Sequence, residues 1–235
     1  MPSLCPASLA HGRLQDNPEG AFLVTEFLDL SARGSASAST ASAAAAKEGE
    51  SSGLSLAAKL ARLHSTPAPV PAGYSKPVFG FPVPTCCGDS EQPNGYRESW
   101  AEFYAENRLL AILKKSERTN GKDAELRDMV ERTAGVVVPR LLGEGHLGGK
   151  NGLVPVVVHG DLWSGNKGRG RIGGRGGVEE VVFDPSSCYA HGEFELGIMR
   201  MFGGFGGAFV REYHELCPKT EPVGEYEDRV SLYEL

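Results

Sequence analysis

The segment from Val154 to Asn166, VPVVVHGDLWSGN, constrains the fold more than any other part of the chain. Its run of β-branched residues predicts a short strand over residues 154–158, and a His, a Gly and an Asp follow in an irregular loop. Residues 178–184, VEEVVFD, predict a returning strand that ends at Asp184. The glycine-rich residues 167–177 are expected to form the turn between the two strands.

The two strands and the loop between them carry three polar side chains, those of Asp161, Asn166 and Asp184, in an arrangement that suits phosphoryl transfer. That reaction needs one group to hold the attacking hydroxyl and oxygen ligands to place a divalent ion against the phosphates. Asp161 and Asn166 have the spacing of the kinase motif H-R-D-x-x-x-x-N, and Asp184 follows after the return strand. The pattern predicts Asp161 as proton acceptor and Asn166 and Asp184 as Mg²⁺ ligands. An H-G-D triplet alone is common, so the prediction depends on all three residues.

Composition limits the other possibilities. The net charge of −6 argues against a general polyanion binder, and no apolar run reaches the roughly 18 residues that span a membrane. The five cysteines form no regular framework, which favours a reducing, cytoplasmic location without a secretory leader. The adjacent Cys86 and Cys87 lack the spacing of a metal-binding pair, and we interpret them as buried or idle thiols.

The rest of the chain predicts a mostly helical body, and therefore an α+β fold. Residues 21–30 are expected to form a strand and a connector, whereas residues 31–53, almost all Ser, Ala and Gly, are expected to be disordered. Residues 79–95 are rich in proline and turn formers and predict a loop. Apolar periodicity predicts five helices: one ending near His64, and others over about residues 97–115, 123–133 (stopped by Gly135), 193–202 and 207–216.

Three longer stretches narrow the interpretation. HGDLWSGN, FDPSSCYAHGEFELGIMRMFGGF and FGFPVPTCCG resemble the fructosamine kinase (ketosamine-3-kinase) family, relatives of the aminoglycoside phosphotransferases with a protein-kinase-like fold. The resemblance implies ATP-dependent phosphorylation of a sugar hydroxyl on protein-bound or free ketosamines, with Mg²⁺, in protein deglycation. Ketosamines or glycated proteins would then be the partners; neither a membrane nor a nucleic acid is expected, and the oligomeric state is left open.

The resemblance also implies roles for residues outside the loop. The TEFL segment would match the kinase hinge, so that Glu26, Phe27 and Leu28 would hold the adenine through their backbone. Trp163 would cover the sugar ring, although a place in the core is an equal alternative. From their positions alone, His159, His191 and Glu195 are expected to support the loop.

The chain departs from the pattern of such kinases near its N-terminus. No strand lysine, phosphate-covering glycine loop or helix glutamate can be found before the hinge, and the sequence resembles most of the larger C-terminal lobe, cut at both ends, with the N-terminal lobe largely absent. We therefore assign residues 1–30 to a remnant of the N-terminal lobe and hinge, 31–53 to the insertion and 54–235 to the larger lobe, and expect impaired turnover.

Two alternatives stay open at this point. One is another small-molecule kinase, acting on an aminoglycoside or an amino alcohol such as choline. The other is a catalytically silent, kinase-like fragment that binds a glycated ligand or a protein partner. A more remote hypothesis is binding of single-stranded nucleic acid by the Arg-Gly segment 167–177, for which a solvated turn is the favoured interpretation.

Overall fold

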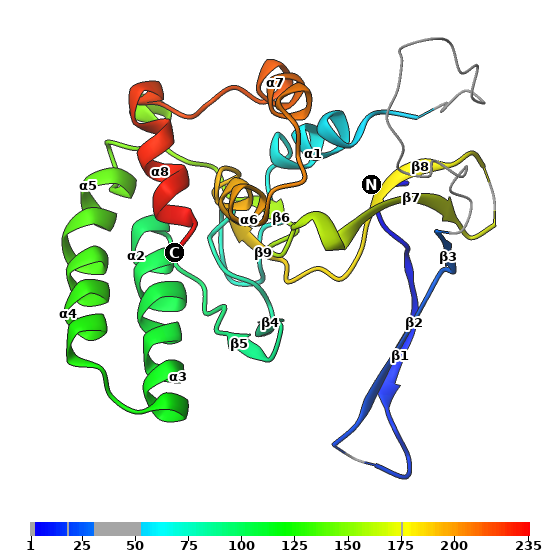
Figure 1. Cartoon of the computed structure of the whole chain (residues 1–235), viewed down its shortest axis with the longest axis horizontal. Helices are drawn as coiled ribbons and strands as arrows, with labels where there is room; N and C mark the ends of the chain where they lie inside the picture. Colours follow the sequence, from blue (N-terminus) through cyan, green and yellow to red (C-terminus); the bar gives the residue numbers. More distant parts are fainter. Residues whose placement is uncertain (1–2, 18, 31–52, 175) are drawn as a thin grey trace, which may run out of the picture.

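The computed structural model describes residues 3–17, 19–30, 53–174 and 176–235. Figure 1 shows a body of helices and short strands, from which a two-stranded ribbon near the N-terminus extends away. The insertion predicted over residues 31–53 lies outside the described residues, except for Gly53. Within the part of the chain that is described, no helix is both long and apolar enough to cross a membrane.

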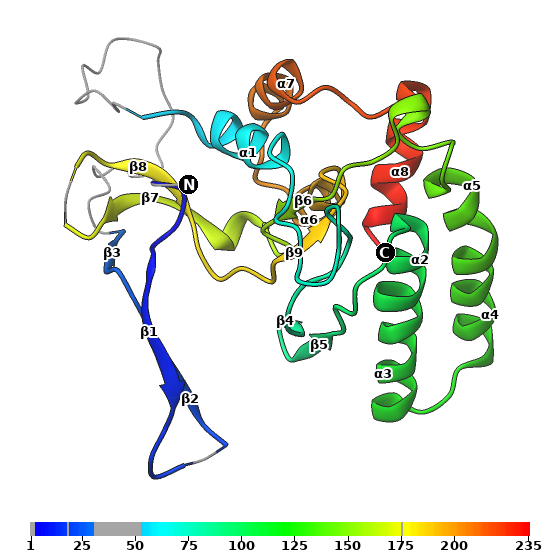
Figure 2. The ribbon, with the colours of Figure 1, turned by 180° about the vertical axis from the view of Figure 1, so that it is seen from behind.

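The N-terminal ribbon consists of β1 (Ser8–Arg13) and β2 (Ala21–Thr25), which pair antiparallel. The sequence predicts β2 but not β1, because residues 1–20 show no alternation of apolar and polar side chains. Both strands are exposed along most of their length, with Leu9 and Leu23 each about two-thirds accessible to solvent. Figure 2 shows the ribbon from behind, again well separated from α4 and α5.

A three-stranded antiparallel sheet connects the ribbon to the body. Its order is β3 (Leu28–Asp29), β7 (Lys167–Ile172) and β8 (Glu179–Val182). The prediction of a turn over residues 167–177 is wrong for its first six residues, which form β7. Glycine is needed in this strand because a Cβ at Gly170 would lie 2.7 Å from the carbonyl oxygen of Asp29 in β3.

The predicted return strand also has a different partner. β6 (Val156–Val158) pairs antiparallel with β9 (Cys188–Ala190), with Val157 opposite Tyr189, whereas β8 pairs with β7. The hairpin is therefore formed by β7 and β8, immediately after the loop that contains Asp161. A further small hairpin, β4 (Thr85–Cys87) and β5 (Ser90–Gln92), lies in the segment that was predicted to be a loop.

Most of the predicted helices are confirmed. They are α1 (Leu56–His64), α6 (Phe194–Phe202), α7 (Gly207–Leu216) and a long helix made of α2 (Trp100–Tyr104), a π-helical turn (Ala105–Leu110) and α3 (Ala111–Asn120). α8 (Tyr226–Tyr233) was not predicted. Single 3₁₀ turns occupy Gly149–Asn151, Ser164–Asn166 and Val223–Glu225.

The stop predicted at Gly135 is wrong. α4 (Ala124–Arg132) continues through a π-helical turn (Thr133–Val137) into α5 (Val138–Leu142). A glycine inside a helix costs only about 1 kcal/mol relative to alanine. Ala134 and Val138 are both buried in the core one helical turn apart, and their packing offsets this cost.

Two hydrophobic clusters meet at the loop that follows β6. The first surrounds Trp100 and includes Phe103, Tyr104 and Val158. The second contains residues of α1, α6, α7 and α8 together with Leu162. Val158 and Leu162 are both fully buried, so each end of the segment around Asp161 is fixed in a different cluster.

A buried polar network fastens α8 to this body. Arg229, which is fully buried, donates to Glu193 Oε2 at 2.8 Å and to the Thr220 carbonyl oxygen at 2.7 Å. His191 lies beside this pair, with Nδ1 2.9 Å from the Tyr233 hydroxyl and Nε2 2.9 Å from the Thr220 hydroxyl. Burial lowers the pKa of His191 to about 4, so the imidazole is neutral in the folded protein.

This burial makes stability depend on pH. Between pH 6.5 and about 4 the unfolded chain binds a proton on His191 that the folded protein does not, so the free energy of unfolding falls as the pH falls, by up to about 3 kcal/mol. His191→Gln should flatten the loss between pH 6.5 and 4.5, measured by urea unfolding, and the exposed His11→Gln should not. Equal slopes for His191→Gln and the unmodified protein would contradict the prediction.

Candidate active site

The structure brings Asp161, Asn166 and Asp184 together. Asn166 Nδ2 donates to the Asp161 carbonyl oxygen at 2.8 Å and to Asp161 Oδ2 at 3.0 Å, and it lies 3.5 Å from the Asp184 carbonyl oxygen. The β7–β8 hairpin accounts for this arrangement, because Phe183 N donates to the Asn166 carbonyl oxygen at 3.0 Å, just beyond the paired Lys167 and Val182. The hairpin thus returns Asp184 to the loop that contains Asp161 and Asn166, and the three residues form one polar site.

Glu195, on α6, anchors the start of the loop through hydrogen bonds to its backbone. Its fully buried carboxylate accepts hydrogen bonds from two successive backbone amides, those of His159 and Gly160. Burial alone would raise the pKa of this carboxyl, but His64, 3.7 Å away, and the His159 amide outweigh it, so the pKa is lowered. Glu195 is therefore a charged anchor on α6 beneath the H-G-D turn.

The His159 ring fixes the other side of the loop. Its Nε2 lies 2.9 Å from the Phe183 carbonyl oxygen, and its Nδ1 accepts from the Asp161 amide at 3.3 Å. Nε2 therefore carries the proton, and the ring bridges the Asp161 turn and the end of β8. At the next position glycine is required, because Gly160 has a φ of 82° and an added Cβ would lie 2.1 Å from the Ser186 carbonyl oxygen.

Asp161 is half-buried, and its surroundings adjust its acidity in opposite directions. Burial raises the pKa of its carboxyl, and the charge of Asp184 adds to this effect. The hydrogen bonds from Cys87 and Asn166 and the proximity of His159 lower it, and the pKa remains raised overall. A carboxylate with a raised pKa is a stronger proton acceptor once it is ionised.

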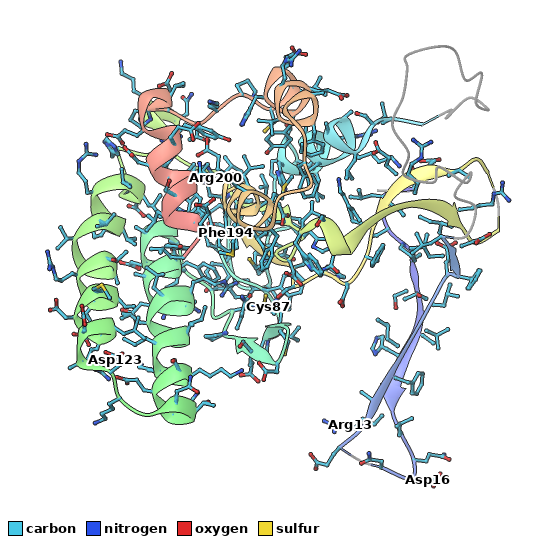
Figure 3. The ribbon with its side chains drawn as sticks, viewed as in Figure 1. Arg13, Asp16, Cys87, Asp123, Phe194 and Arg200 are labelled. Atoms are coloured by element: carbon cyan, nitrogen blue, oxygen red, sulfur yellow. The ribbon has the colours of Figure 1, made fainter. Side chains whose placement is uncertain are left out.

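Cys87 is the residue of the site that sequence reasoning missed. Its Sγ donates to Asp161 Oδ1 at 3.7 Å, from the end of β4. Cys86 is exposed and Cys87 is half-buried, so neither is the buried thiol that the interpretation as buried or idle thiols allowed, and Cys87 has a polar partner in Asp161. The only available signal was that FGFPVPTCCG carries part of the family resemblance, and nothing in it indicates which thiol faces the loop. Figure 3 labels Cys87 between the long helices and the β7–β8 strands.

The donors at this site fit a magnesium ion. With Nδ2 of Asn166 committed to Asp161, its Oδ1 is the atom that can coordinate a cation. Asp184 is exposed and has a φ of 59°, a left-handed conformation that Asp tolerates better than most residues. The described residues contain no cluster of three or more His, Cys, Asp or Glu with metal-binding geometry. One amide and one carboxylate are a suitable set for Mg²⁺, which keeps waters and binds substrate phosphates.

Trp163 lies on the surface of the loop. Its side chain is 39% exposed, and its ring centroid is 5.7 Å from that of Phe202, which is also exposed. A core position for Trp163 is therefore wrong. Two exposed aromatic rings at the end of α6 leave an apolar surface beside the loop, and the assignment of Trp163 to a sugar stays a prediction.

The predicted hinge residues lie in the connection between β2 and β3. Glu26 exchanges hydrogen bonds with Ala7 through its amide and its carboxylate, and the Phe27 carbonyl oxygen accepts from Gly173 N at 2.8 Å. Leu28 pairs with Ile172. The sheet β3–β7–β8 thus links this connection to Asn166, although some of its backbone groups are already used by the protein.

Three residues were expected to support the loop, and their hydrogen bonds differ. Glu195 contacts the loop directly, whereas the hydrogen bonds of His191 go to Tyr233 and Thr220, at the attachment of α8. His159 binds within the loop itself.

Comparison with known proteins identifies the fold and the family of the chain. The fold is shared with a solved protein from Haemophilus somnus 129PT assigned as a fructosamine-3-kinase, with a TM-score of 0.67 at 22% identity over 98% of this chain and 63% of that one. A corresponding protein from Thermobifida fusca YX-ER1 gives a TM-score of 0.59 at 26% identity over 76% of this chain and 54% of that one. The fold is therefore that of fructosamine-3-kinase structures.

The sequence leads to the same class. The model of the fructosamine kinase family matches residues 2–235 of this chain, and the chain belongs to this family. Ketosamine-3-kinase of Mus musculus is 37% identical over 67% of this chain and 45% of its own length. The chloroplastic protein-ribulosamine 3-kinase of Oryza sativa subsp. indica is 32% identical over 91% of this chain and 52% of its own length.

The chain spans about half the length of these curated relatives. The family match over residues 2–235 gives no support to the expectation that the sequence is cut at both ends. The division into lobes stays a prediction.

The anchor under the loop can be tested directly. In Glu195→Gln the amide can accept from only one of the two backbone amides and turns its own NH₂ toward the other, which should destabilise the protein by about 1–3 kcal/mol. Amide hydrogen exchange at His159 and Gly160 should also become faster. The exposed Glu215→Gln is the control, and unchanged exchange in Glu195→Gln would contradict the anchoring role.

Proposed function

We propose that this chain carries the catalytic centre of an ATP-dependent kinase that phosphorylates a sugar hydroxyl of protein-bound or free ketosamines, such as fructosamines and ribulosamines. The observation that carries the proposal is the convergence of Asp161, Asn166 and Asp184 on one loop and hairpin. Family membership supports it, as do the names of the relatives, ketosamine-3-kinase and protein-ribulosamine 3-kinase.

In this proposal Asp161 accepts the proton of the sugar hydroxyl. The hydroxyl oxygen forms a bond to the γ-phosphorus of ATP while the bond from that phosphorus to the bridging oxygen of ADP breaks. Asn166 Nδ2 holds Oδ2 of Asp161 at 3.0 Å, which orients the carboxylate for this step. Positioning of this kind supplies much of the rate in phosphoryl transfer, because the reaction needs little covalent chemistry from the protein.

Asn166 and Asp184 would hold Mg²⁺, which neutralises charge on the phosphates when it is bound. The connection at Glu26, Phe27 and Leu28 would receive the adenine, and Trp163 would cover the sugar. The sheet β3–β7–β8 supports this set of roles because it joins the adenine and metal positions through paired backbone. We extend the proposal to a cytoplasmic protein, since all five cysteines are free thiols.

A different small-molecule kinase would share the loop but not the acceptor. The exposed pair of Trp163 and Phe202 favours a ring-shaped sugar over an acyclic amino alcohol such as choline, because an aromatic face covers the apolar side of a ring. Comparison of fructoselysine, an aminoglycoside and choline as acceptors separates these alternatives.

The proton acceptor is tested by Asp161→Asn. Transfer of labelled phosphate from Mg·ATP to fructoselysine should fall by about 100- to 10,000-fold, because the amide cannot accept the hydroxyl proton. The exposed Asp128→Asn on α4 is the control and should keep the rate of the unmodified chain. Transfer that survives Asp161→Asn would remove Asp161 as the proton acceptor, and absence of transfer with Asp161 present would refute the proposed function.

The metal role is tested without turnover. Mn²⁺ can replace Mg²⁺ and its binding in the presence of ATP can be followed by electron paramagnetic resonance. Asp184→Asn should weaken Mn²⁺ binding by about tenfold or more, because it removes the charged ligand. Asp128→Asn should bind Mn²⁺ as the unmodified chain does, and equal affinity in Asp184→Asn would remove this residue from the metal site.

A further inference from the structure

Both carboxylate oxygens of Asp161 have a side-chain donor. Asn166 Nδ2 binds Oδ2 at 3.0 Å, and the Cys87 thiol donates to Oδ1 at 3.7 Å. The first donor is part of the catalytic loop itself. The second comes from the β4–β5 hairpin, 74 residues earlier in the sequence, and the roles proposed above do not use it.

The hairpin is fixed by groups that reach it from the long helix. Arg108, which is only 3% exposed, donates to Asn94 Oδ1 at 2.9 Å and to the Pro93 carbonyl oxygen at 3.0 Å. Asn94 Nδ2 in turn donates to the Val83 carbonyl oxygen at 3.0 Å and to the Thr85 hydroxyl at 2.9 Å. These bonds join the residues that enter the hairpin to those that leave it, next to the buried Arg108 guanidinium group.

A second contact joins the hairpin to the loop after Asp184. The Ser186 hydroxyl donates to Gln92 Oε1 at 3.3 Å, and both side chains are buried. β4 and β5 therefore contact both halves of the site, with Cys87 against Asp161 and Gln92 against Ser186.

The chemistry of the Cys87 thiol suits a donor. Burial first, and then the charge of Asp161, raise the pKa of the Cys87 thiol, so it remains protonated at neutral pH. A thiol is a weak donor, so it can orient a carboxylate oxygen and still yield that oxygen to a substrate hydroxyl. Cys86 is exposed, because neighbouring side chains in a strand point to opposite faces.

We propose that Cys87 is a positioning residue for the phosphoryl-transfer reaction, which holds Oδ1 of Asp161 in the orientation that accepts the hydroxyl proton. The inference rests on the proposed function. The long helix, through Arg108 and the hairpin, thereby contributes to the orientation of the Asp161 carboxylate, together with Asn166.

The first test separates position from simple stability. Cys87→Ala should lower kcat by about three- to tenfold and leave the KM for ATP unchanged, because one weak hydrogen bond to a charged group is lost. Cys87→Ser should recover part of kcat, since a hydroxyl can donate in place of the thiol. Cys86→Ala is the matched control and should keep the original kcat. A Cys87→Ala enzyme with unchanged kcat would overturn the inference.

The second test does not depend on turnover. In a Cys86→Ala background, alkylation of Cys87 by iodoacetamide is followed at pH 8 by mass spectrometry. Adding Asp161→Asn should speed alkylation several-fold, because the negative charge that raises the thiol pKa is gone. Asp128→Asn should leave the rate unchanged. Equal rates with Asp161 and with Asn at this position would show that the thiol does not contact the carboxylate.

The two tests also separate this inference from the proposed function. If Asp161→Asn abolishes transfer and Cys87→Ala does not slow it, the function stands and the role of Cys87 is wrong. If no variant transfers phosphate but alkylation still responds to Asp161→Asn, the contact is real and the proposed reaction, with the role of Cys87 in it, is wrong.

Discussion

The pair of hydrogen bonds from the His159 and Gly160 amides to the buried Glu195 carboxylate is the interaction on which the site depends. The chain leaves β6 with two amides pointing into the protein, where leaving them without an acceptor would be costly. The Glu195 carboxylate accepts from both amides with its two oxygens, and it thereby connects the His159–Gly160 segment to the first turn of α6. Asp161 follows directly, so its place is set before its own side chain makes any contact.

The polar site could be predicted from the sequence because its residues follow one another within a single strand-loop-hairpin segment of the chain. The Asp161-to-Asn166 spacing and the strand before Asp184 are local features, and the structure brings these three residues together. Family membership, inferred from three short stretches, is also shown by comparison with known proteins. The roles of these residues are proposals, for which the geometry gives support.

Long-range pairing could not be predicted in the same way. Periodicity identified the residues of β6 and β8 but not that β6 pairs with β9 across the loop. Glycine-rich β7 has a turn-like composition, and the close approach of β3 that requires glycine at position 170 cannot be read from the sequence. Cys87 presents the same difficulty: its contact with Asp161 joins residues that are 74 positions apart in sequence, and no local pattern reports it. The helix that begins with α4 continues past Gly135 into α5, because Ala134 and Val138 pack in the core and no local signal reports this packing.

The attachment of Val158 to one hydrophobic cluster and of Leu162 to the other has a mechanical consequence. The few residues between them form a short tether whose two ends belong to separate packed bodies. Any sliding of one body over the other would change the span of the tether and rotate the peptide groups next to Asp161. The two clusters must therefore move together if the Asp161 carboxylate is to keep its orientation.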